Sequence, residues 1–166
     1  IGLITNHGYL DNPTFRGMRW HCLKTFTNIT VLDLHGNTKK KEITPDGKAD
    51  KNVFDIQQGV AIFIGSRSLA KPLGLAEVQH LDVWGEKNVK YDLLNSIKTF
   101  SSSNFFSKIN PYEPQYMLAK RDAKAQVRYE EGFALTELMP VKSVGFVTSR
   151  DSFALSYEKK DIEERI

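Results

Sequence analysis

Two short apolar runs that end in polar groups constrain the fold of this 166-residue chain more than any other feature. Residues 1–5 read IGLIT and residues 29–34 read ITVLDL, and both runs are rich in branched side chains. Continuous runs of this kind favour strands that are buried on both faces of a sheet. The polar groups that follow the two runs are Asn6-His7-Gly8 and His35-Gly36-Asn37. We therefore predict two buried strands with polar side chains at their carboxyl ends.

The segment between these runs has the spacing of a helix. Asp11 or Asn12 can cap its N-terminus, and Pro13 suits a first turn, where its missing N–H is not needed. Apolar residues recur every three or four positions, at Phe15, Met18, Cys22, Leu23 and Phe26. Basic residues fall largely elsewhere, at Arg16, Arg19 and Lys24. We predict a helix over residues 13–26 and, with its flanking strands, one parallel βαβ unit of an α/β fold.

The strands of a βαβ unit run in the same direction, so their carboxyl ends meet at one edge of the sheet. We therefore expect Asn6 and His7 to face the same side of the sheet as His35 and Asn37. Residues 37–58 follow without any sustained period and with many charges. They predict a long loop, and loops of that length inside a compact domain are usually functional or mobile.

Local patterns predict the remaining elements. Residues 59–64 read as another buried strand, and residues 75–83 are a candidate hairpin partner, with Pro72 and Gly74 in the turn. Residues 86–98 have helical spacing, with the apolar residues Val89, Leu93, Leu94 and Ile97. After a serine-rich break the patterns favour an extended connection at 110–116, helices at 121–131 and 158–166, and extended segments at 144–150 and 153–157.

Composition excludes several classes of protein. The net charge of +3 is too small to indicate nucleic-acid binding by bulk charge, and no apolar stretch approaches the roughly 20 residues of a membrane span. The single cysteine, Cys22, allows no disulfide framework. We expect a cytoplasmic protein with no membrane partner. Because the chain starts with Ile1 inside an apolar run, we also expect it to be a fragment of a larger protein.

No complete active site is visible in the motifs. The four histidines, at positions 7, 21, 35 and 80, show no compact ligand spacing, and Asp33 with His35 would supply only two ligands. The sequence also contains no G-x-S-x-G, G-x-G-x-x-G or G-x-x-x-x-G-K-[ST] motif. We therefore predict structural or edge histidines and no metal site.

The pentapeptide DNPTF at residues 11–15 is a near match to the catalytic tetrapeptide of DNA amino-methyltransferases, (D/N/S)-P-P-(Y/F/W). That motif needs two prolines, because the rigid pair directs two hydrogen-bond acceptors at one amino group, and Thr14 replaces the second proline. The catalytic tetrapeptide also follows its strand closely, whereas six residues separate Thr5 from Asn12. A helix start is therefore the favoured interpretation.

Two features of the long loop allow either a structural or a functional interpretation. Lys39, Lys40 and Lys41 form a solvated loop or contact nucleic-acid phosphates, and the run alone favours the solvated loop. Phe54 lies between polar residues just before a strand. It is either a packing residue or a platform for an unstacked base, a role worth about 1–3 kcal/mol per base.

Taken together, three segments resemble a known family: ITNHGYLDNPTFRGMRWHCLKTF, VLDLHGN with its lysines, and NVFDIQQGVAIFI. They are similar to the N6-adenine DNA methyltransferase region of large single-chain restriction-modification enzymes of the Type ISP kind. AEVQHLDVWG and VKSVGFVTSRD resemble the continuation toward the target-recognition part. The resemblance covers nearly the whole chain and is most specific over the first 64 residues.

The resemblance implies a position within the larger enzyme. In that family the glycine-rich S-adenosylmethionine motif and the N-P-P-Y tetrapeptide come upstream of the three segments. The implied fold is a partial Rossmann-like methyltransferase sheet, with a βαβ unit and an antiparallel strand pair, followed by a smaller α+β segment. Residues 1–84 would be the C-terminal half of the catalytic domain, 85–103 a helix and linker, and 104–166 a segment leading to the target-recognition region.

The resemblance also implies roles for individual residues. The parent enzyme would methylate a flipped adenine of double-stranded DNA with S-adenosylmethionine, and Phe54 would stack on that base while Phe63 stays in the core. Rim contacts would come from Asn6, His7, His35 and Asn37, and phosphate contacts from Lys39, Lys40 and Lys41. This chain alone is expected to be inactive without the remaining domains of the parent polypeptide. The alternative is a non-catalytic DNA-binding or structural module, and a metal- or triad-dependent hydrolase has the least support.

Overall fold

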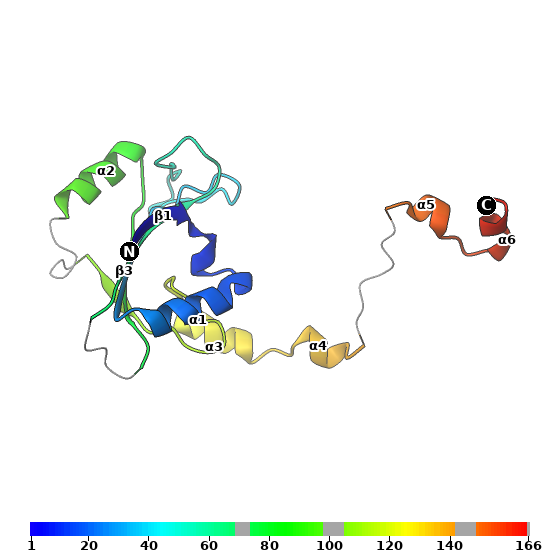
Figure 1. Cartoon of the computed structure of the whole chain (residues 1–166). Helices are drawn as coiled ribbons and strands as arrows, with labels where there is room; N and C mark the ends of the chain where they lie inside the picture. Colours follow the sequence, from blue (N-terminus) through cyan, green and yellow to red (C-terminus); the bar gives the residue numbers. More distant parts are fainter. Residues whose placement is uncertain (69–73, 98–104, 142–148, 166) are drawn as a thin grey trace. The chain divides into compact units, whose positions relative to one another are not determined.

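The computed structural model describes residues 1–68, 74–97, 105–141 and 149–165 (Figure 1). The chain divides into two compact units, Ile1–Arg121 and Asp122–Ile166. The first unit holds the sheet. None of the helices in the described ranges has the length and hydropathy that crossing a bilayer requires.

Within the described ranges, five strands form one mixed sheet in the order β1-β3-β2-β4-β5. Their bounds are β1 Gly2–Asn6, β2 Asn28–Asp33, β3 Val60–Ser66, β4 Glu77–Asp82 and β5 Ser107–Ile109. The pair β2 and β4 is parallel, and the other three pairs are antiparallel. A mixed sheet with helices confirms the α/β class.

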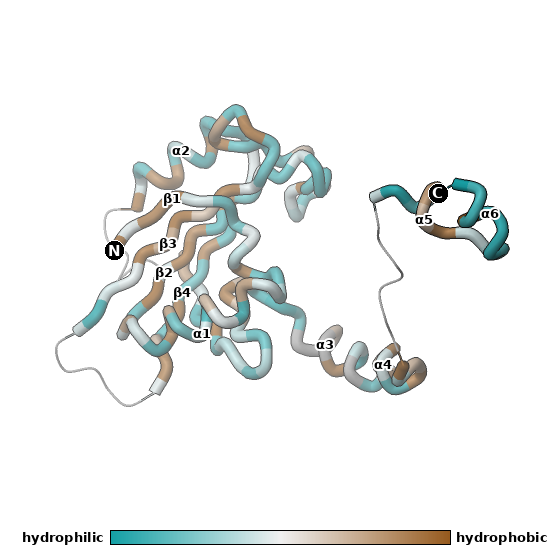
Figure 2. The backbone as a smooth tube through the Cα atoms, turned by 45° about the vertical axis from the view of Figure 1, so that its right-hand side comes forward, coloured by the Kyte–Doolittle hydropathy of each residue, from teal (hydrophilic) through white to brown (hydrophobic). Residues whose placement is uncertain are grey.

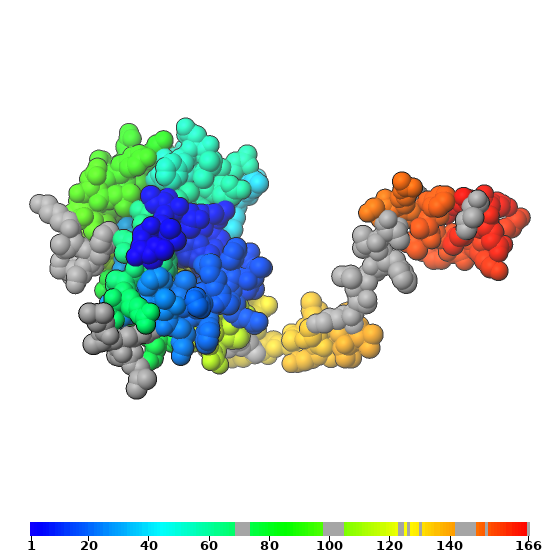
Figure 3. All heavy atoms as spheres, viewed as in Figure 1, coloured from blue at the N-terminus to red at the C-terminus, as the bar shows by residue number. Residues whose placement is uncertain are grey.

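The pairing of the predicted βαβ unit is wrong. β1 and β2 run in the same direction, but β3 lies between them and pairs with both, so that Ala61 lies opposite both Thr5 and Asp33. β1 is therefore an edge strand, and all five of its residues are exposed (Figure 3). The predicted burial of the first run is therefore also wrong, whereas β2 is buried from Ile29 to Asp33. An apolar run does not specify its partner, and the continuously apolar β3 provides an antiparallel neighbour on each side.

The predicted hairpin between the third and fourth strands is also wrong. β4 falls within the predicted range 75–83, but it pairs in parallel with β2, with Val31 opposite His80, and makes no ladder with β3. Of the two residues predicted in the connecting turn, Pro72 lies outside the described residues, and Gly74 has a φ of +128°.

The predicted first helix is confirmed as two consecutive elements. A 3₁₀ turn covers Pro13–Phe15 and α1 covers Arg16–Thr25. The Asn12 side chain accepts a hydrogen bond from the backbone N–H of Thr14 at 2.9 Å, and Pro13 occupies the first turn. DNPTF is therefore a helix start. Another 3₁₀ turn, His7–Leu10, precedes it and connects it to β1.

The pleat of the strands divides the core into two layers. Ile29 and Val31 of β2 pack with one cluster, to which α1 contributes Leu23, whereas Leu32 and Leu34 pack with the other. The second layer is covered by Leu93, Leu94 and Ile97, which lie on or directly after α2 Lys87–Ser96. α1 and α2 thus cover opposite faces of the sheet (Figures 1 and 2). The predicted helix at 86–98 is confirmed.

Arg19 of α1 is fully buried, although its position predicted a polar face. Its Nη1 donates to the carbonyl oxygens of Tyr9 and Asn12, each at 2.8 Å, and its Nε and Nη2 donate to that of Gln115 at 3.0 and 2.8 Å. The three carbonyl oxygens belong to turns and loop segments. One guanidinium therefore fixes the turns before α1 and the irregular segment that follows β5.

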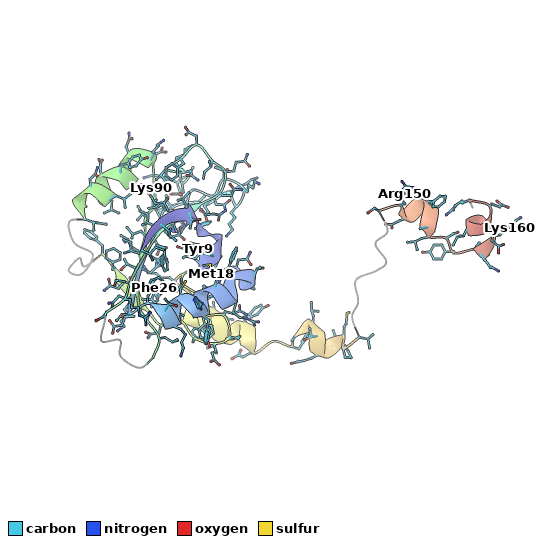
Figure 4. The ribbon with its side chains drawn as sticks, viewed as in Figure 1. Tyr9, Met18, Phe26, Lys90, Arg150 and Lys160 are labelled. Atoms are coloured by element: carbon cyan, nitrogen blue, oxygen red, sulfur yellow. The ribbon has the colours of Figure 1, made fainter. Side chains whose placement is uncertain are left out.

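Lys90 of α2 plays a similar part on the other face and is also fully buried (Figure 4). Its Nζ donates to the Asp50 carboxylate at 2.8 Å and to the backbone oxygens of Leu34 and Lys51, each at 2.6 Å. Asp50 additionally accepts from the backbone N–H of Gly85 at 2.7 Å. All three ammonium protons are thus used, and the ion pair joins α2 to the end of β2 and to the long loop.

The described part of the second unit contains four short helices: α3 Ala123–Glu130, α4 Leu135–Leu138, α5 Asp151–Ala154 and α6 Lys159–Glu163. The helices predicted at 121–131 and 158–166 are confirmed. The extended segment predicted at 153–157 is wrong in its first two residues, which lie in α5. Most of the one predicted at 144–150 lies outside the described residues.

The buried ion pair on α2 gives a direct test of this architecture. Lys90→Met leaves Asp50 buried without its partner, so we expect the free energy of unfolding to fall by about 3–5 kcal/mol. Lys87→Met is the matched control on the same helix, because it leaves the pair intact, and should change stability by less than about 0.5 kcal/mol. Urea denaturation of both variants measures the difference, and equal stabilities would contradict a structural role for the pair.

Candidate site at the carboxyl edge of the sheet

Polar side chains gather where β1, β2 and β4 end. A pocket of about 250 Å³ lies there, and we define the edge cluster as five of its lining residues: His7, Asp33, His35, Glu42 and Asp82. The prediction that the two polar strand ends face the same side of the sheet is confirmed. His7 and His35 lie edge to face at 6.2 Å between ring centroids, and the Asn37 amide nitrogen is 3.4 Å from His7 Nε2.

Asp33 is the centre of this cluster. Its Oδ1 lies 3.0 Å from His7 Nδ1 and accepts the backbone N–H of His35 at 3.0 Å. Both residues of the His7–Asp33 pair are buried, with side chains 7% and 9% exposed, so their mutual hydrogen bond replaces lost hydration. Gly59 makes room for the imidazole, because a Cβ at that position would lie 2.4–2.9 Å from the His7 ring.

His35 is held from several directions. Its Nε2 lies 3.1 Å from Asp82 Oδ1, and its Nδ1 lies 3.7 Å from Asp33 Oδ2 and 3.9 Å from Glu42 Oε1. The ring stacks on Trp84 with 3.3 Å between centroids and 12° between planes. Its backbone has a φ of +50°, which carries the chain sharply away from β2.

The charges of the cluster shift the pKa values of its members. Burial alone lowers the pKa of His35, but hydrogen bonds with Asp82 and Glu42 and the charges of Asp33 and Asp82 raise it to about 9. Burial raises the pKa of Asp82, yet His35, His80 and Lys120 together lower it to about 2. The Lys120 ammonium lies 3.1 Å from Asp82 Oδ2. His35 and Asp82 are therefore an ion pair at neutral pH.

His80 lies beside the cluster on β4 and is fully buried. Its Nδ1 is 3.7 Å from Asp82 Oδ2, and neither ring nitrogen has a hydrogen-bond partner among the described residues. Burial lowers the pKa of this imidazole. Its environment thus differs from that of His35, although both rings lie beside the same carboxylate.

Two overlapping groups of described residues have the donor atoms of a metal site. His7, His35 and Glu42 form one group, and Asp33, His35 and Asp82 form the other. Within each group the candidate ligand atoms lie within 4.8 Å of one another. No sequence motif indicates either complete group, because His7 and Asp82 lie far in sequence from the other members of their groups.

The predicted loop at 37–58 is confirmed and is held by side chains. Glu42 accepts the backbone N–H of Asn37 at 2.8 Å. Asn52 donates from Nδ2 to the carbonyl oxygens of Gly36 at 3.1 Å and Gln58 at 2.7 Å. A Cβ on Gly36 would lie 2.4 Å from the backbone of Asn52, so this position requires glycine. The loop is thus fastened to the end of β2 in several places.

The other predicted site residues are not members of the edge cluster. Phe54 is 44% exposed, and its backbone N–H is held by Asn52 Oδ1 at 2.8 Å. Lys39, Lys40 and Lys41 are exposed, and Lys40 lines the pocket. The Asn6 side chain caps the turn that follows β1 by accepting from the backbone N–H of Gly8 at 2.8 Å. Asn6 lines a different, apolar pocket between β1 and α1.

Sequence reasoning did not find Glu42, Asp82, Trp84 or Lys120. One signal was present, because β2 and β4 end in the related strings LDLHG, residues 32–36, and LDVWG, residues 81–85. The parallel ladder aligns them residue by residue, with Leu32 opposite Leu81 and Asp33 opposite Asp82. In the same register His35 meets Trp84. A repeated sequence pattern of this kind, at the ends of two predicted strands, indicates that the strands are parallel neighbours.

Comparison with known proteins defines the class to which this fold is similar. No protein-family model and no curated protein sequence matches the chain. Solved structures do match, and they are large restriction-modification enzymes or other DNA complexes. The chain spans only 11–17% of their length, although 99% of the chain is covered. The fold is therefore that of one segment of such proteins.

Two of the similar structures are Type ISP enzymes. The ATP-dependent Type ISP restriction-modification enzyme LlaBIII bound to DNA is 27% identical, with a TM-score of 0.66. A nuclease-deletion mutant of the Type ISP enzyme LlaGI in complex with a DNA substrate mimic is 20% identical with a TM-score of 0.64, and a DrdV–DNA complex is 22% identical with a TM-score of 0.62. The resemblance to Type ISP enzymes inferred from the sequence is confirmed.

Gly59 provides a test of the packing around His7. In Gly59→Ala the new methyl group meets the buried imidazole, so we expect the His7–Asp33 hydrogen bond to break and stability to fall by about 1–3 kcal/mol. Gly2→Ala is the strand control, because a Cβ there meets no atom within 4 Å. NMR of the histidine ring N–H groups and urea denaturation measure both effects. An intact hydrogen bond in Gly59→Ala would contradict the packing described.

The raised pKa of His35 predicts a pH dependence of stability. The folded protein binds this proton more tightly than the unfolded chain, whose histidine has its ordinary value of 6.5. The contribution is fully present below pH 6.5 and should be lost as the pH rises through about 9. Unfolding free energies between about pH 5 and 10, measured in EDTA, are expected to show this decline. His35→Asn, which tolerates the positive φ, should flatten it, and an unchanged slope would exclude His35 as its origin.

Proposed function

We propose that this chain is the later part of the adenine-N6 DNA methyltransferase region of a restriction-modification enzyme. The observation that carries the proposal is the match to the DNA-bound Type ISP enzyme LlaBIII, at 27% identity over 99% of the chain. The segments that resemble the methyltransferase region at the level of sequence are the same segments that build β1, α1, β2 and β3. DNA binding is the part of this function that the matched structures support most directly.

The exposed edge of the sheet supports a place inside a larger enzyme. β1 carries exposed apolar side chains, with Leu3 49% and Ile4 59% exposed. A mainly apolar pocket of about 770 Å³ lies between this strand and α1, where Phe15 and Met18 are also exposed. An open strand edge beside an apolar surface favours association with further chain. We assign this surface to the remaining domains of the parent polypeptide.

S-adenosylmethionine is the methyl donor in this proposal, but this chain does not supply the glycine-rich loop that binds it. The sequence contains neither a glycine-rich strand-to-helix loop nor an N-P-P-Y tetrapeptide. We therefore assign the cofactor and the reacting amino group to other segments of the parent enzyme. The contribution of this chain is the rim of the site and its contacts with DNA.

The long loop is the part of the rim best suited to DNA. It presents the lysine run at Lys39, Lys40 and Lys41 to solvent and exposes Phe54. Asn52 fixes the backbone of Phe54 and ties it to the end of β2, so the aromatic ring projects from a constrained turn. We assign Phe54 to stacking on the flipped adenine and the lysines to the neighbouring phosphates.

The stacking role is tested in the full-length enzyme. Phe54→Ala is expected to lower the rate of methyl transfer to adenine N6 of duplex DNA about 5- to 100-fold, since base stacking on an aromatic contributes about 1–3 kcal/mol. Ile56→Ala is the control, because Ile56 is 47% exposed on the same loop and has no assigned role. Both substitutions should leave the stability of the isolated chain within about 0.5 kcal/mol of the unmodified value.

The outcomes separate the competing functions. An unchanged rate in Phe54→Ala, with adenine still methylated, would reject the stacking role alone. A full-length protein that binds DNA and transfers no methyl group to adenine would reject the methyltransferase and favour a non-catalytic DNA-binding module.

A further inference from the structure

Three of the cluster's side chains come from different parts of the fold and converge on one point. His7 follows β1, His35 follows β2, and Glu42 lies in the long loop. Their candidate ligand atoms lie within 4.8 Å of one another, and the pair His35 Nδ1 and Glu42 Oε1 is 3.9 Å apart. A tetrahedral ion with bonds of about 2.0–2.2 Å needs ligand atoms roughly 3.4 Å apart. Small side-chain movements would therefore close the group around an ion.

The orientation of both imidazoles suits metal binding. Asp33 engages Nδ1 of His7, so Nε2, which lies 3.4 Å from the Asn37 amide nitrogen, is the nitrogen that a metal ion would use. Asp82 engages Nε2 of His35, which leaves Nδ1. A carboxylate on the far nitrogen fixes the tautomer and the ring direction of a metal-bound histidine and raises its basicity. Each histidine thus has its own orienting carboxylate.

The charge around the pocket also favours the binding of a cation. Four carboxylates, those of Asp11, Asp33, Glu42 and Asp82, line one small pocket, and Lys40 and Lys120 are the lysines among its lining residues. Lys40 is exposed, and Lys120 pairs with Asp82. The carboxylates of Asp33 and Glu42 instead face the two histidines, and both contact His35. Negative charge therefore gathers around the imidazoles, where a cation is stabilised.

We propose that His7, His35 and Glu42 bind one divalent cation of the zinc class, with Asp33 and Asp82 holding the two imidazoles. Two imidazole nitrogens and a carboxylate suit Zn²⁺, and Co²⁺ as its spectroscopic substitute, whereas Mg²⁺ and Ca²⁺ prefer oxygen ligands throughout. The ion takes the place of the proton on His35 Nδ1, because both use the same lone pair. A water molecule completes the coordination.

The role of the ion is structural. It joins the turn after β1, the end of β2 and the long loop, three segments that no strand ladder among the described residues connects to one another. Because ion binding is coupled to the folded arrangement, it stabilises the protein. The site involves neither DNA nor S-adenosylmethionine, so its existence can be tested independently of the proposed function.

The test is titration of ZnCl₂ into the metal-free 166-residue chain, followed by isothermal calorimetry and by thermal unfolding. We expect one equivalent to bind, and the unfolding temperature to rise by about 5–10 °C at a hundredfold excess over Kd. Glu42→Gln retains an acceptor for the Asn37 N–H, and His35→Asn tolerates the local backbone. Each should weaken zinc binding at least tenfold while the chain stays folded by circular dichroism.

His21→Gln is the matched control, because His21 is exposed on α1 and outside the cluster. This variant should bind zinc as the unmodified chain does. No binding by the folded, unmodified chain would overturn the proposal. Binding that persists in both Glu42→Gln and His35→Asn, or that is lost in His21→Gln, would also overturn it, since the ion would then lie elsewhere.

Discussion

The carboxylate of Asp33 is the interaction on which the edge of this sheet depends. It lies at the end of β2, the strand that pairs with both β3 and β4, and it engages His7 and the backbone of His35 at once. Because β3 separates β1 from β2, no ladder hydrogen bond joins their carboxyl ends. A buried carboxylate is stable only where several donors meet it, so the turn after β1 and the bend after β2 must form together.

The sequence predicts those features of the fold that depend on neighbouring residues, and it does not predict those that depend on contacts between distant residues. Strands β1 to β4 and helices α1 and α2 could be predicted because apolar runs and helical spacing are properties of neighbouring residues, whereas the three-residue β5 was missed. The strand partners could not, since residues 60–66 satisfy two neighbours that the local pattern does not name. Arg19 and Lys90 were missed for a related reason. Each is buried because carbonyl oxygens distant in sequence, such as those of Gln115 and Leu34, need donors.

In the candidate site, too, some features could be predicted from local sequence and others depend on contacts between distant residues. The meeting of His7, His35 and Asn37 was predictable even though the pairing was wrong, because strand direction alone places their strand ends at one edge. Asp82 required knowledge that β4 lies beside β2 in parallel. Glu42 required the path of an irregular loop, which is fixed by contacts such as its own hydrogen bond with the Asn37 N–H. The roles assigned to these residues in binding DNA remain predictions.

The edge of the sheet separates two kinds of chemistry. The inner edge cluster is largely buried and rich in carboxylates, so it would repel phosphates and is better suited to holding structure or a cation. The outer loop carries the exposed lysines and Phe54, which suit phosphates and an unstacked base. The loop leaves β2 at His35 and Gly36 and is fastened there by Glu42 and Asn52. Rigidity at the inner cluster therefore sets the position of the surface proposed to contact DNA, and loosening the cluster should displace that surface.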